Sequence, residues 1–169
     1  RKIVRKFNDT YHTSIVEPQA RLSQVSRLSG LDGNAKMGKS LNNAIYLSDT
    51  SKEVEGKVRK AVTDPARVTK DIPGDPTICN VAKYHKIFTP GEYDNICSMC
   101  RSASIGCVAC KKILTTSLNT LLDPFREKRA YYEGHLDVVK EIIVEGTKKA
   151  NKVGDATVAM MKDAMHIAL

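Results

Sequence analysis

Two lysines lie three residues apart in a short segment that is rich in glycine and poor in bulky side chains. The segment runs Leu31-Asp32-Gly33-Asn34-Ala35-Lys36-Met37-Gly38-Lys39-Ser40. Glycines let backbone amides approach a bound anion closely, and lysine ammonium groups are point charges suited to phosphate oxygens. The segment therefore predicts a polyphosphate-binding loop, although its glycine spacing is not that of a P-loop. Taken alone, the same pattern is also compatible with a solvated basic turn.

The residues that follow the lysines add to this prediction. Ser40 supplies a hydroxyl group, and the segment from Leu41 to Ala44 is expected to open a helical turn. The N–H groups at the start of such a turn would face the same anion.

Five cysteines form a second group with chemical potential. Cys97 and Cys100 make one Cys-x-x-Cys pair, Cys107 and Cys110 make another, and Cys79 lies upstream. Paired Cys-x-x-Cys units in a chain without a secretory signal favour ligation of a soft metal over disulfides. Buried free thiols are the alternative.

Two sets of four thiolates are compatible with the helices expected here. In an antiparallel helix pair the start of the first helix meets the end of the second, which brings Cys79 toward Cys100. The first set is Cys79, Cys100, Cys107 and Cys110, and the second is Cys97, Cys100, Cys107 and Cys110. His85 lies near Cys79 in sequence and is a further candidate ligand.

The elements before residue 71 are expected to be helices joined by a long loop. An apolar stripe on Ile3, Phe7 and Tyr11 predicts an amphipathic helix to about Thr13. Residues 19–45 are polar and are expected to form the functional loop, with 45–47 as a short strand or an extended link. Thr50-x-x-Glu53 is a capping box for a helix that Asp64-Pro65 would end.

The rest of the chain is also expected to be helical. Residues 71–76 predict a linker and a domain boundary, after which Thr77 would cap a helix. Thr89 to Glu92 resembles a capping box with proline at the first helical position, opening a helix to about Arg101. A leucine-rich helix would be interrupted at Asp123-Pro124, and residues 136–168 would be mostly helix, bent or broken at its glycines.

The composition indicates a globular protein with a polyanionic partner. The chain has 169 residues, of which 41% are hydrophobic and 27% charged, and its net charge is +8. No apolar run approaches the roughly 20 residues that span a bilayer, so we expect a soluble protein without membrane attachment. The chain opens mid-pattern at Arg1, which suggests part of a longer protein.

The lysine segment and its flanks carry a family resemblance. Gly30 to Gly33 followed by Lys36 to Ile45 closely resembles the KMSKS signature of class I aminoacyl-tRNA synthetases, in particular the tryptophanyl branch. The resemblance implies that the lysines stabilise the ATP triphosphate while the amino acid attacks the α-phosphate. It implies the catalytic residues Lys36 and Lys39, and the ATP-binding residues Lys36, Met37, Gly38, Lys39 and Ser40. Gly38 departs from the usual serine.

The cysteines are similar to those of some bacterial members of this family. Those members have a cysteine before a Lys-Tyr-His stretch and then C-x6-C-x2-C, and they hold a 4Fe–4S cluster near the anticodon-binding region. The resemblance implies the ligand set Cys79, Cys100, Cys107 and Cys110, leaves Cys97 spare, and favours a 4Fe–4S cluster over zinc. On spacing alone, a four-thiolate zinc site fits equally well.

The resemblance implies a mainly α chain with two parts. Residues 1–70 would be the C-terminal part of a Rossmann catalytic domain with the KMSKS-type loop, and residues 71–169 a helical anticodon-binding domain. The full-length enzyme would be a cytoplasmic homodimer that joins L-tryptophan to tRNA(Trp) using ATP and Mg²⁺. The chain alone is expected to be inactive, since it contains no HIGH-type motif.

Two other interpretations remain open at this point. A non-catalytic nucleic-acid-binding module with a four-cysteine metal site would explain the charge and the cysteines but not the lysine segment. The tyrosyl branch shares the loop but not the cysteines. Under the tryptophanyl interpretation as well, a basic cluster downstream of the cysteines would face tRNA phosphates, or it is a solvated helix face; its members are Lys111, Lys112, Arg126, Lys128 and Arg129.

Overall fold

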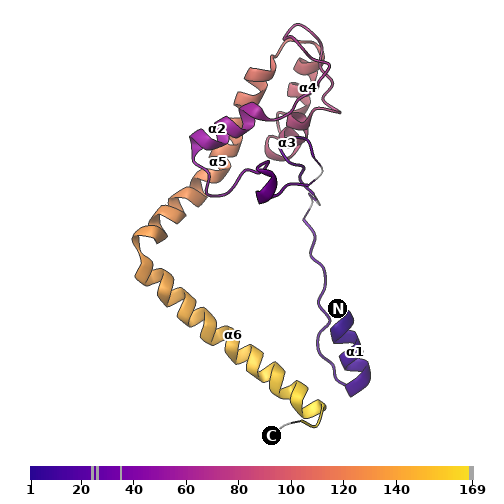
Figure 1. The fold of residues 1–169 in the computed structure, drawn as a ribbon, viewed down its shortest axis with the longest axis vertical. Helices are drawn as coiled ribbons and strands as arrows, with labels where there is room; N and C mark the ends of the chain where they lie inside the picture. The colour runs from indigo at the N-terminus through magenta and orange to yellow at the C-terminus, as the bar shows by residue number, and fades with distance from the viewer. Residues whose placement is uncertain (24, 26, 35, 168–169) are drawn as a thin grey trace. The chain divides into compact units, whose positions relative to one another are not determined.

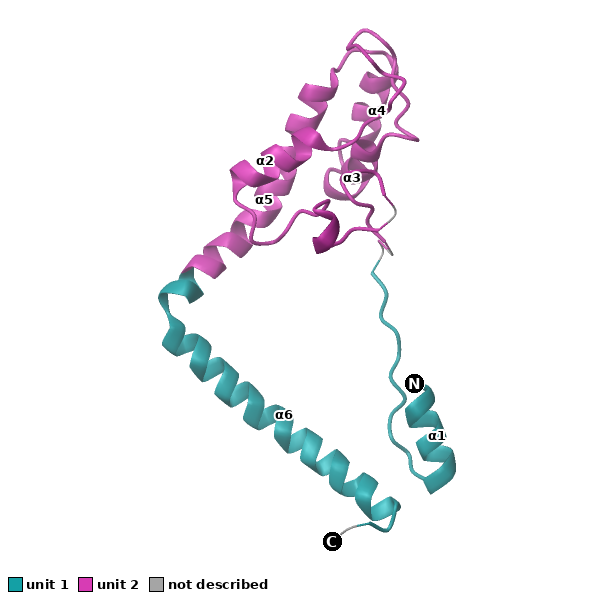
Figure 2. Ribbon diagram, in the orientation of Figure 1, with its two compact units in different colours: residues 1–23, 131–169 teal, residues 24–130 magenta. Residues whose placement is uncertain are grey.

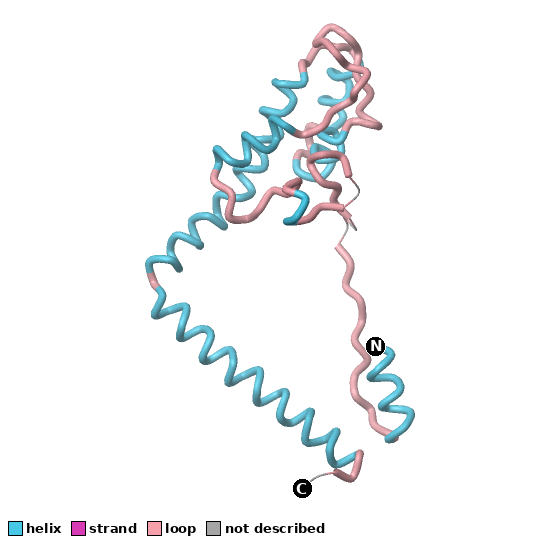
Figure 3. The backbone as a smooth tube through the Cα atoms, viewed as in Figure 1, coloured by secondary structure: helices cyan, strands magenta, loops and turns pink. Residues whose placement is uncertain are grey.

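The computed structural model of the chain describes residues 1–23, 25, 27–34 and 36–167. The chain divides into two compact units, residues 1–23 with 131–169 and residues 24–130 (Figure 2). The described residues form helices and loops and no strand (Figure 3), so the mainly α prediction is confirmed for them. The helices, labelled in Figure 1, are α1 (Lys2–Tyr11), η1 (Lys39–Leu41), α2 (Ser51–Lys60), α3 (Asn80–Phe88), α4 (Tyr93–Arg101), α5 (Cys107–Gly134) and α6 (Leu136–Ala164).

The core of the 24–130 unit is made where α2, α3 and α5 meet. Apolar side chains at helical spacing supply it: Val54 and Val58 from α2, Val81, Ala82 and Tyr84 from α3, and Leu114, Leu118 and Leu122 from α5. Full burial of a side chain of this size contributes about 1.5–3 kcal/mol. This shared core holds the loops on either side of α2 and α3 in place.

The α2 helix begins as predicted and ends early. The Thr50 hydroxyl accepts the Glu53 N–H, and the Glu53 carboxylate accepts the Thr50 N–H, which confirms the capping box. The helix ends at Lys60, one turn before Asp64-Pro65. The Asp64 carboxylate accepts the N–H groups of Ala66 and Asp75 and so organises the loop that follows.

The starts predicted for α3 and α4 are wrong by two and three residues, respectively. The Thr77 hydroxyl donates to Asp75, so α3 begins only after Cys79. The Thr89 hydroxyl bonds to His85, so it cannot cap α4, which begins after Glu92 and ends at Arg101 as expected. In both cases the threonine hydroxyl that was predicted to cap a helix is instead hydrogen-bonded to a residue that precedes it in the sequence.

The interruption predicted at Asp123-Pro124 is also wrong, because α5 runs through it. Pro124 is exposed, so water can reach the carbonyl that lost its intrahelical donor. The Arg126 guanidinium braces this part of the helix: it donates to Asn119, to Asp123 and to the Asp49 carbonyl before α2. These bonds tie α5 to the segment that follows the lysine loop.

The linker predicted at residues 71–76 lies inside the 24–130 unit. The Gly74 N–H donates to the Cys100 carbonyl at 3.0 Å, and the Asp75 N–H donates to Asp64. The segment is therefore held against α4. The division into domains at residue 70 remains a prediction.

The other unit contains α1 and α6. The first helix ends at Tyr11, where His12 is left-handed (φ 52°), and Arg1 and Arg5 pair with Glu17 beyond it. The last helix is continuous through both of its glycines, contrary to the expected bend or break, and none of its residues is buried. Ala168, the predicted end, lies outside the described residues. None of the described helices is long and apolar enough to cross a membrane.

Candidate phosphate loop and cysteine site

The buried Asn43 holds the lysine loop in shape. Its side-chain oxygen accepts the Gly38 N–H, and its side-chain NH₂ donates to the Lys36 carbonyl, both at 3.0 Å. The same NH₂ group donates to the Asp32 carboxylate at 3.0 Å. One side chain, 3% exposed, therefore fixes the backbone on both sides of Met37.

Two glycines make this arrangement possible. A β-carbon at Gly30 would clash with the Asn43 amide and the Asp32 carboxylate. Gly33 has φ +84°, which favours glycine. The loop enters its turn through positions where side chains are sterically or conformationally excluded.

The predicted phosphate-binding side chains project from this fixed backbone. Lys36, Lys39 and Ser40 are exposed, whereas Met37 is half-buried and packs against the hydrophobic core. The helical turn expected at 41–44 does not form; a short 3₁₀ turn, Lys39–Leu41, directly follows Gly38. The loop thus presents two ammonium groups from an anchored segment, and their contact with ATP remains a prediction.

Four of the cysteines gather where α3, α4 and α5 approach one another. Cys79 precedes α3, Cys100 lies in the last turn of α4, and Cys107 and Cys110 lie in the first turn of α5. Burial and the charges of the other three cysteines raise the pKa of Cys110 to about 12. Burial likewise raises the pKa of Cys100, and Cys79 and Cys107 add to the effect.

The fifth cysteine stands apart from these four. Cys97 is buried and hydrogen-bonded to the Tyr93 hydroxyl, which raises the pKa of Tyr93. Of the two candidate ligand sets, the structure brings together the one that contains Cys79. Across the described part of the chain, no group of three or more His, Cys, Asp or Glu side chains is placed to hold a metal ion.

A buried arginine lies against this thiol cluster. Arg67 is 8% exposed and directs Nη1 at the Cys100 sulfur, 3.5 Å away. Its Nη2 donates to the carbonyls of Lys70 and Ile105, and its Nε has no partner. No ion pair joins it to a carboxylate among the described residues, so negative charge on the sulfurs would offset a costly buried cation.

His85 is also placed beside the cluster but is not arranged as a ligand. Its Nδ1 lies 2.6 Å from the Thr89 hydroxyl, and its Nε2 faces the Cys110 carbonyl and sulfur at 3.2 and 3.4 Å. Both ring nitrogens are therefore occupied by the protein, which disfavours the prediction of His85 as a ligand.

Replacing Gly74 with alanine is expected to disturb the cysteine site. The new β-carbon would lie 2.8 Å from the Cys100 sulfur and 3.0 Å from Arg67 Cδ, so one of the two must move. We expect the variant to hold about 10-fold less tightly whatever metal the wild type binds, as measured by chelator competition. Gly91→Ala is the control, because its β-carbon would meet no atom within 4 Å; equal affinity in both variants would contradict the prediction.

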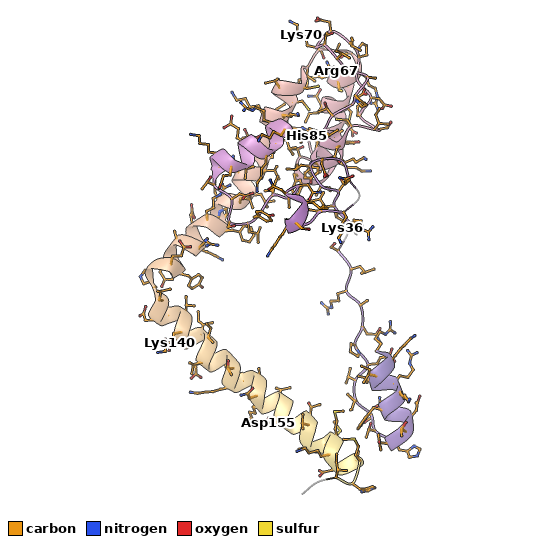
Figure 4. The ribbon with its side chains drawn as sticks, in the orientation of Figure 1. Lys36, Arg67, Lys70, His85, Lys140 and Asp155 are labelled. Atoms are coloured by element: carbon orange, nitrogen blue, oxygen red, sulfur yellow. The ribbon has the colours of Figure 1, made fainter. Side chains whose placement is uncertain are left out.

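The two sites lie well apart within the 24–130 unit. In Figure 4, Lys36 is at one end of the unit and Lys70 and Arg67 are at the other, with His85 between them. The thiol cluster, which includes the sulfur that Arg67 faces, is therefore too distant to take part in chemistry at the lysine loop.

Sequence patterns did not reveal the residues that support these sites. Asn43 lies in the flank of the lysine signature with no role assigned to it, and Arg67 belongs to no motif; only the fold shows that each is buried against a functional segment. The expected basic cluster is in part engaged in the fold: Lys111 donates to the Arg59 carbonyl, and Arg126 braces α5. Lys112 and Lys128 remain exposed.

Comparison with known proteins places the chain in a family. The model of the class I tRNA synthetases (W and Y) matches residues 1–123. The chain belongs to this family. Among its relatives are the tryptophan–tRNA ligases of Aquifex aeolicus and Thermotoga maritima, which are 39% and 40% identical to it over 169 residues.

The family members are longer than this chain. The alignment covers 99% of the chain but 42% of the Aquifex protein and 51% of the Thermotoga protein, so the chain spans about half the length of these relatives. A solved structure of tryptophanyl-tRNA synthetase from Campylobacter jejuni, complexed with ADP and tryptophan, has the same fold. Its TM-score is 0.78 at 24% identity, over 98% of this chain and 52% of that one.

Proposed function

We propose that the full-length protein is a tryptophan–tRNA ligase, which activates L-tryptophan with ATP and Mg²⁺ and transfers it to tRNA(Trp). The observation that carries this proposal is the 34–40% identity to tryptophan–tRNA ligases over nearly the whole chain. In this proposal the chain is the C-terminal half of a cytoplasmic homodimer. Residues 1–70 complete a Rossmann catalytic domain, and residues 71–169 form the helical domain that binds the anticodon.

The lysine loop would act on the ATP phosphates. Lys36 and Lys39 carry positive charge that would offset the charge developing on the pyrophosphate as the α-phosphate is attacked. Asn43 holds the backbone between them, so the ammonium groups would start near their working positions. Ser40 would add a hydroxyl contact to the same phosphates, and Gly38, whose N–H is bonded to Asn43, would shape the loop around them.

An aminoacylation assay tests the proposed activity. The full-length protein should charge total tRNA with radiolabelled tryptophan and not with tyrosine. Residues 1–169 alone should show no tryptophan-dependent ATP–pyrophosphate exchange. Charging with tyrosine would place the protein in the other branch of the family. No charging with either amino acid, combined with RNA binding, would favour the non-catalytic module.

We further propose that Cys79, Cys100, Cys107 and Cys110 hold a 4Fe–4S cluster. The donor set is suitable because four thiols lie within electrostatic reach of one another. One of them, Cys100, faces the buried Arg67 guanidinium, whose Nε is unpartnered, and an anionic cluster would supply its missing counter-charge. When bound, the cluster would cross-link the start of α3, the end of α4 and the start of α5.

A zinc ion is the alternative to the iron–sulfur cluster. A single zinc ion draws four sulfurs into one tetrahedron, whereas each thiolate of a 4Fe–4S cluster binds a different iron, which needs more widely spaced sulfurs. Four thiolates can serve either group, so the metal content of the protein decides between them.

Metal analysis after anaerobic purification separates these cases. About four irons and four sulfides per chain, with a visible absorption band, would support the cluster. One zinc without sulfide would replace the cluster with a zinc staple. Neither metal would overturn the metal site and leave the ligase proposal on the lysine loop and the relatives.

A further inference from the structure

Asn80, the first residue of α3, is buried and hydrogen-bonded to a segment far upstream in the sequence. Its side-chain NH₂ group donates to the Gly30 carbonyl at 2.9 Å, and its side-chain oxygen accepts the Ser29 hydroxyl at 2.7 Å. A carbonyl oxygen can only accept a hydrogen bond, so the NH₂ group must be the end that faces Gly30. The proposed activity gives this side chain no role.

Tyr84, one turn further along α3, holds the same segment. Its hydroxyl donates to the Ser29 carbonyl, and its ring is 1% exposed in the core of the 24–130 unit. Since Asn80 and Tyr84 are four residues apart in a helix, they lie on one face of it. This face therefore holds two consecutive residues, Ser29 and Gly30, directly before the lysine loop.

The hydrogen bonds continue from this point into the loop. The Gly30 carbonyl, which is bonded to α3, also accepts the Gly33 N–H at 3.0 Å. The next residue, Leu31, donates its N–H to the Asn43 carbonyl at 2.8 Å. Asn43 is the residue whose side chain fixes the backbone on both sides of Met37. Hydrogen bonds and the short chain segments between them thus join α3 to the backbone between the two lysines.

We propose that Asn80 and Tyr84 are positioning residues for the lysine loop: they fix its entry, and so fix where its two lysines meet the ATP phosphates. The inference rests on the proposed function, which gives the loop its phosphate ligand. Both side chains are buried, so they act through the backbone of the loop and not by touching ATP. Such positioning matters because a misplacement of about 1 Å can cost about 100-fold in rate.

Two variants remove these bonds with different effects on packing. Tyr84→Phe removes one hydroxyl and keeps the buried ring, whereas Asn80→Ala removes both bonds of the amide. In the full-length protein, we expect kcat for ATP–pyrophosphate exchange to fall about 3-fold in Tyr84→Phe and about 10-fold in Asn80→Ala, with the KM for tryptophan within about two-fold of the wild type. Titration of the sites that form aminoacyl-adenylate gives kcat per active site, which loss of folded protein alone would not change.

A matched control and a double variant sharpen this test. Tyr93→Phe removes the hydroxyl of a half-buried tyrosine in α4 that is bonded to Cys97 and not to the loop, and it should keep kcat within about two-fold of the wild type. Because Asn80 would act through the lysines, Asn80→Ala should have a smaller effect in a Lys36→Ala background than in the wild type. Equal effects in the two backgrounds would overturn the inference.

Amide hydrogen exchange tests the same connection without any reaction. In the full-length protein without ATP, the hydrogen-bonded N–H groups of Leu31 and Gly38 should exchange faster in Asn80→Ala than in the wild type, because the entry of the loop opens more often. Tyr93→Phe should leave their exchange unchanged.

The failures of the two proposals give different results. A wild type without tryptophan-dependent ATP–pyrophosphate exchange would overturn the proposed function, and with it the ligand of the loop. An active wild type whose kcat per active site is unchanged in Asn80→Ala would overturn the inference alone. A lower kcat without faster amide exchange at Leu31 and Gly38 would also overturn it, because the effect would not pass through the loop.

Discussion

Alanine at Lys36 or Lys39 in the full-length protein is expected to lower kcat for tryptophan activation by about 100-fold or more. Each ammonium group would act mainly on charge that develops in the transition state, so its loss should affect kcat more than the KM for tryptophan. Both side chains are exposed, so the variants should fold like the wild type. ATP–pyrophosphate exchange, measured over a range of ATP concentrations, gives both parameters.

A matched control comes from the same unit. Lys52 is an exposed lysine in the first turn of α2, outside the loop, and Lys52→Ala should leave exchange within about two-fold of the wild type. A loss in Lys52→Ala as large as in Lys36→Ala would show that net charge, not the loop, is responsible. Unchanged exchange in both loop variants would remove the catalytic role from Lys36 and Lys39.

Serine at Cys110 is expected to abolish metal binding and to lower the melting temperature by about 10 °C. Cys110 is one of the four clustered thiols and lies in the first turn of α5, so its sulfur would fix that helix to α3 and α4. A bound group that prefers the folded state stabilises it by mass action, and the stabilisation disappears with the site. Metal content and thermal unfolding by circular dichroism measure both effects.

The spare cysteine supplies the control for this experiment. Cys97→Ser changes a buried thiol that is hydrogen-bonded to Tyr93 and does not belong to the thiol cluster. It should retain the metal and melt within a few degrees of the wild type. If Cys97→Ser loses the metal, the ligand set built on Cys79 is wrong. Chelator treatment of the wild type should reproduce the melting temperature of Cys110→Ser.

Local patterns were sufficient where one short segment decides the structure. The capping box at Thr50 and Glu53 forms as predicted, because both partners lie within a single turn. The same type of pattern failed at Thr77 and Thr89, where side chains outside the pattern compete for the hydroxyl. Pro124 failed as a helix breaker because Arg126 joins that part of α5 to Asp49, far away in sequence.

The sequence by itself determined the chemistry: two lysines in a glycine-containing loop, four thiols at metal-ligand spacing, and the family to which they point. These features depend on residue type and short spacing, which are properties of the chain. Only the tertiary structure decided that Cys79 and not Cys97 lies with the other three thiols, that Asn43 is bonded to the lysine loop, and that Arg67 is buried against Cys100. Those contacts join segments distant in sequence, and the packing of α2, α3 and α5 around one core brings them together.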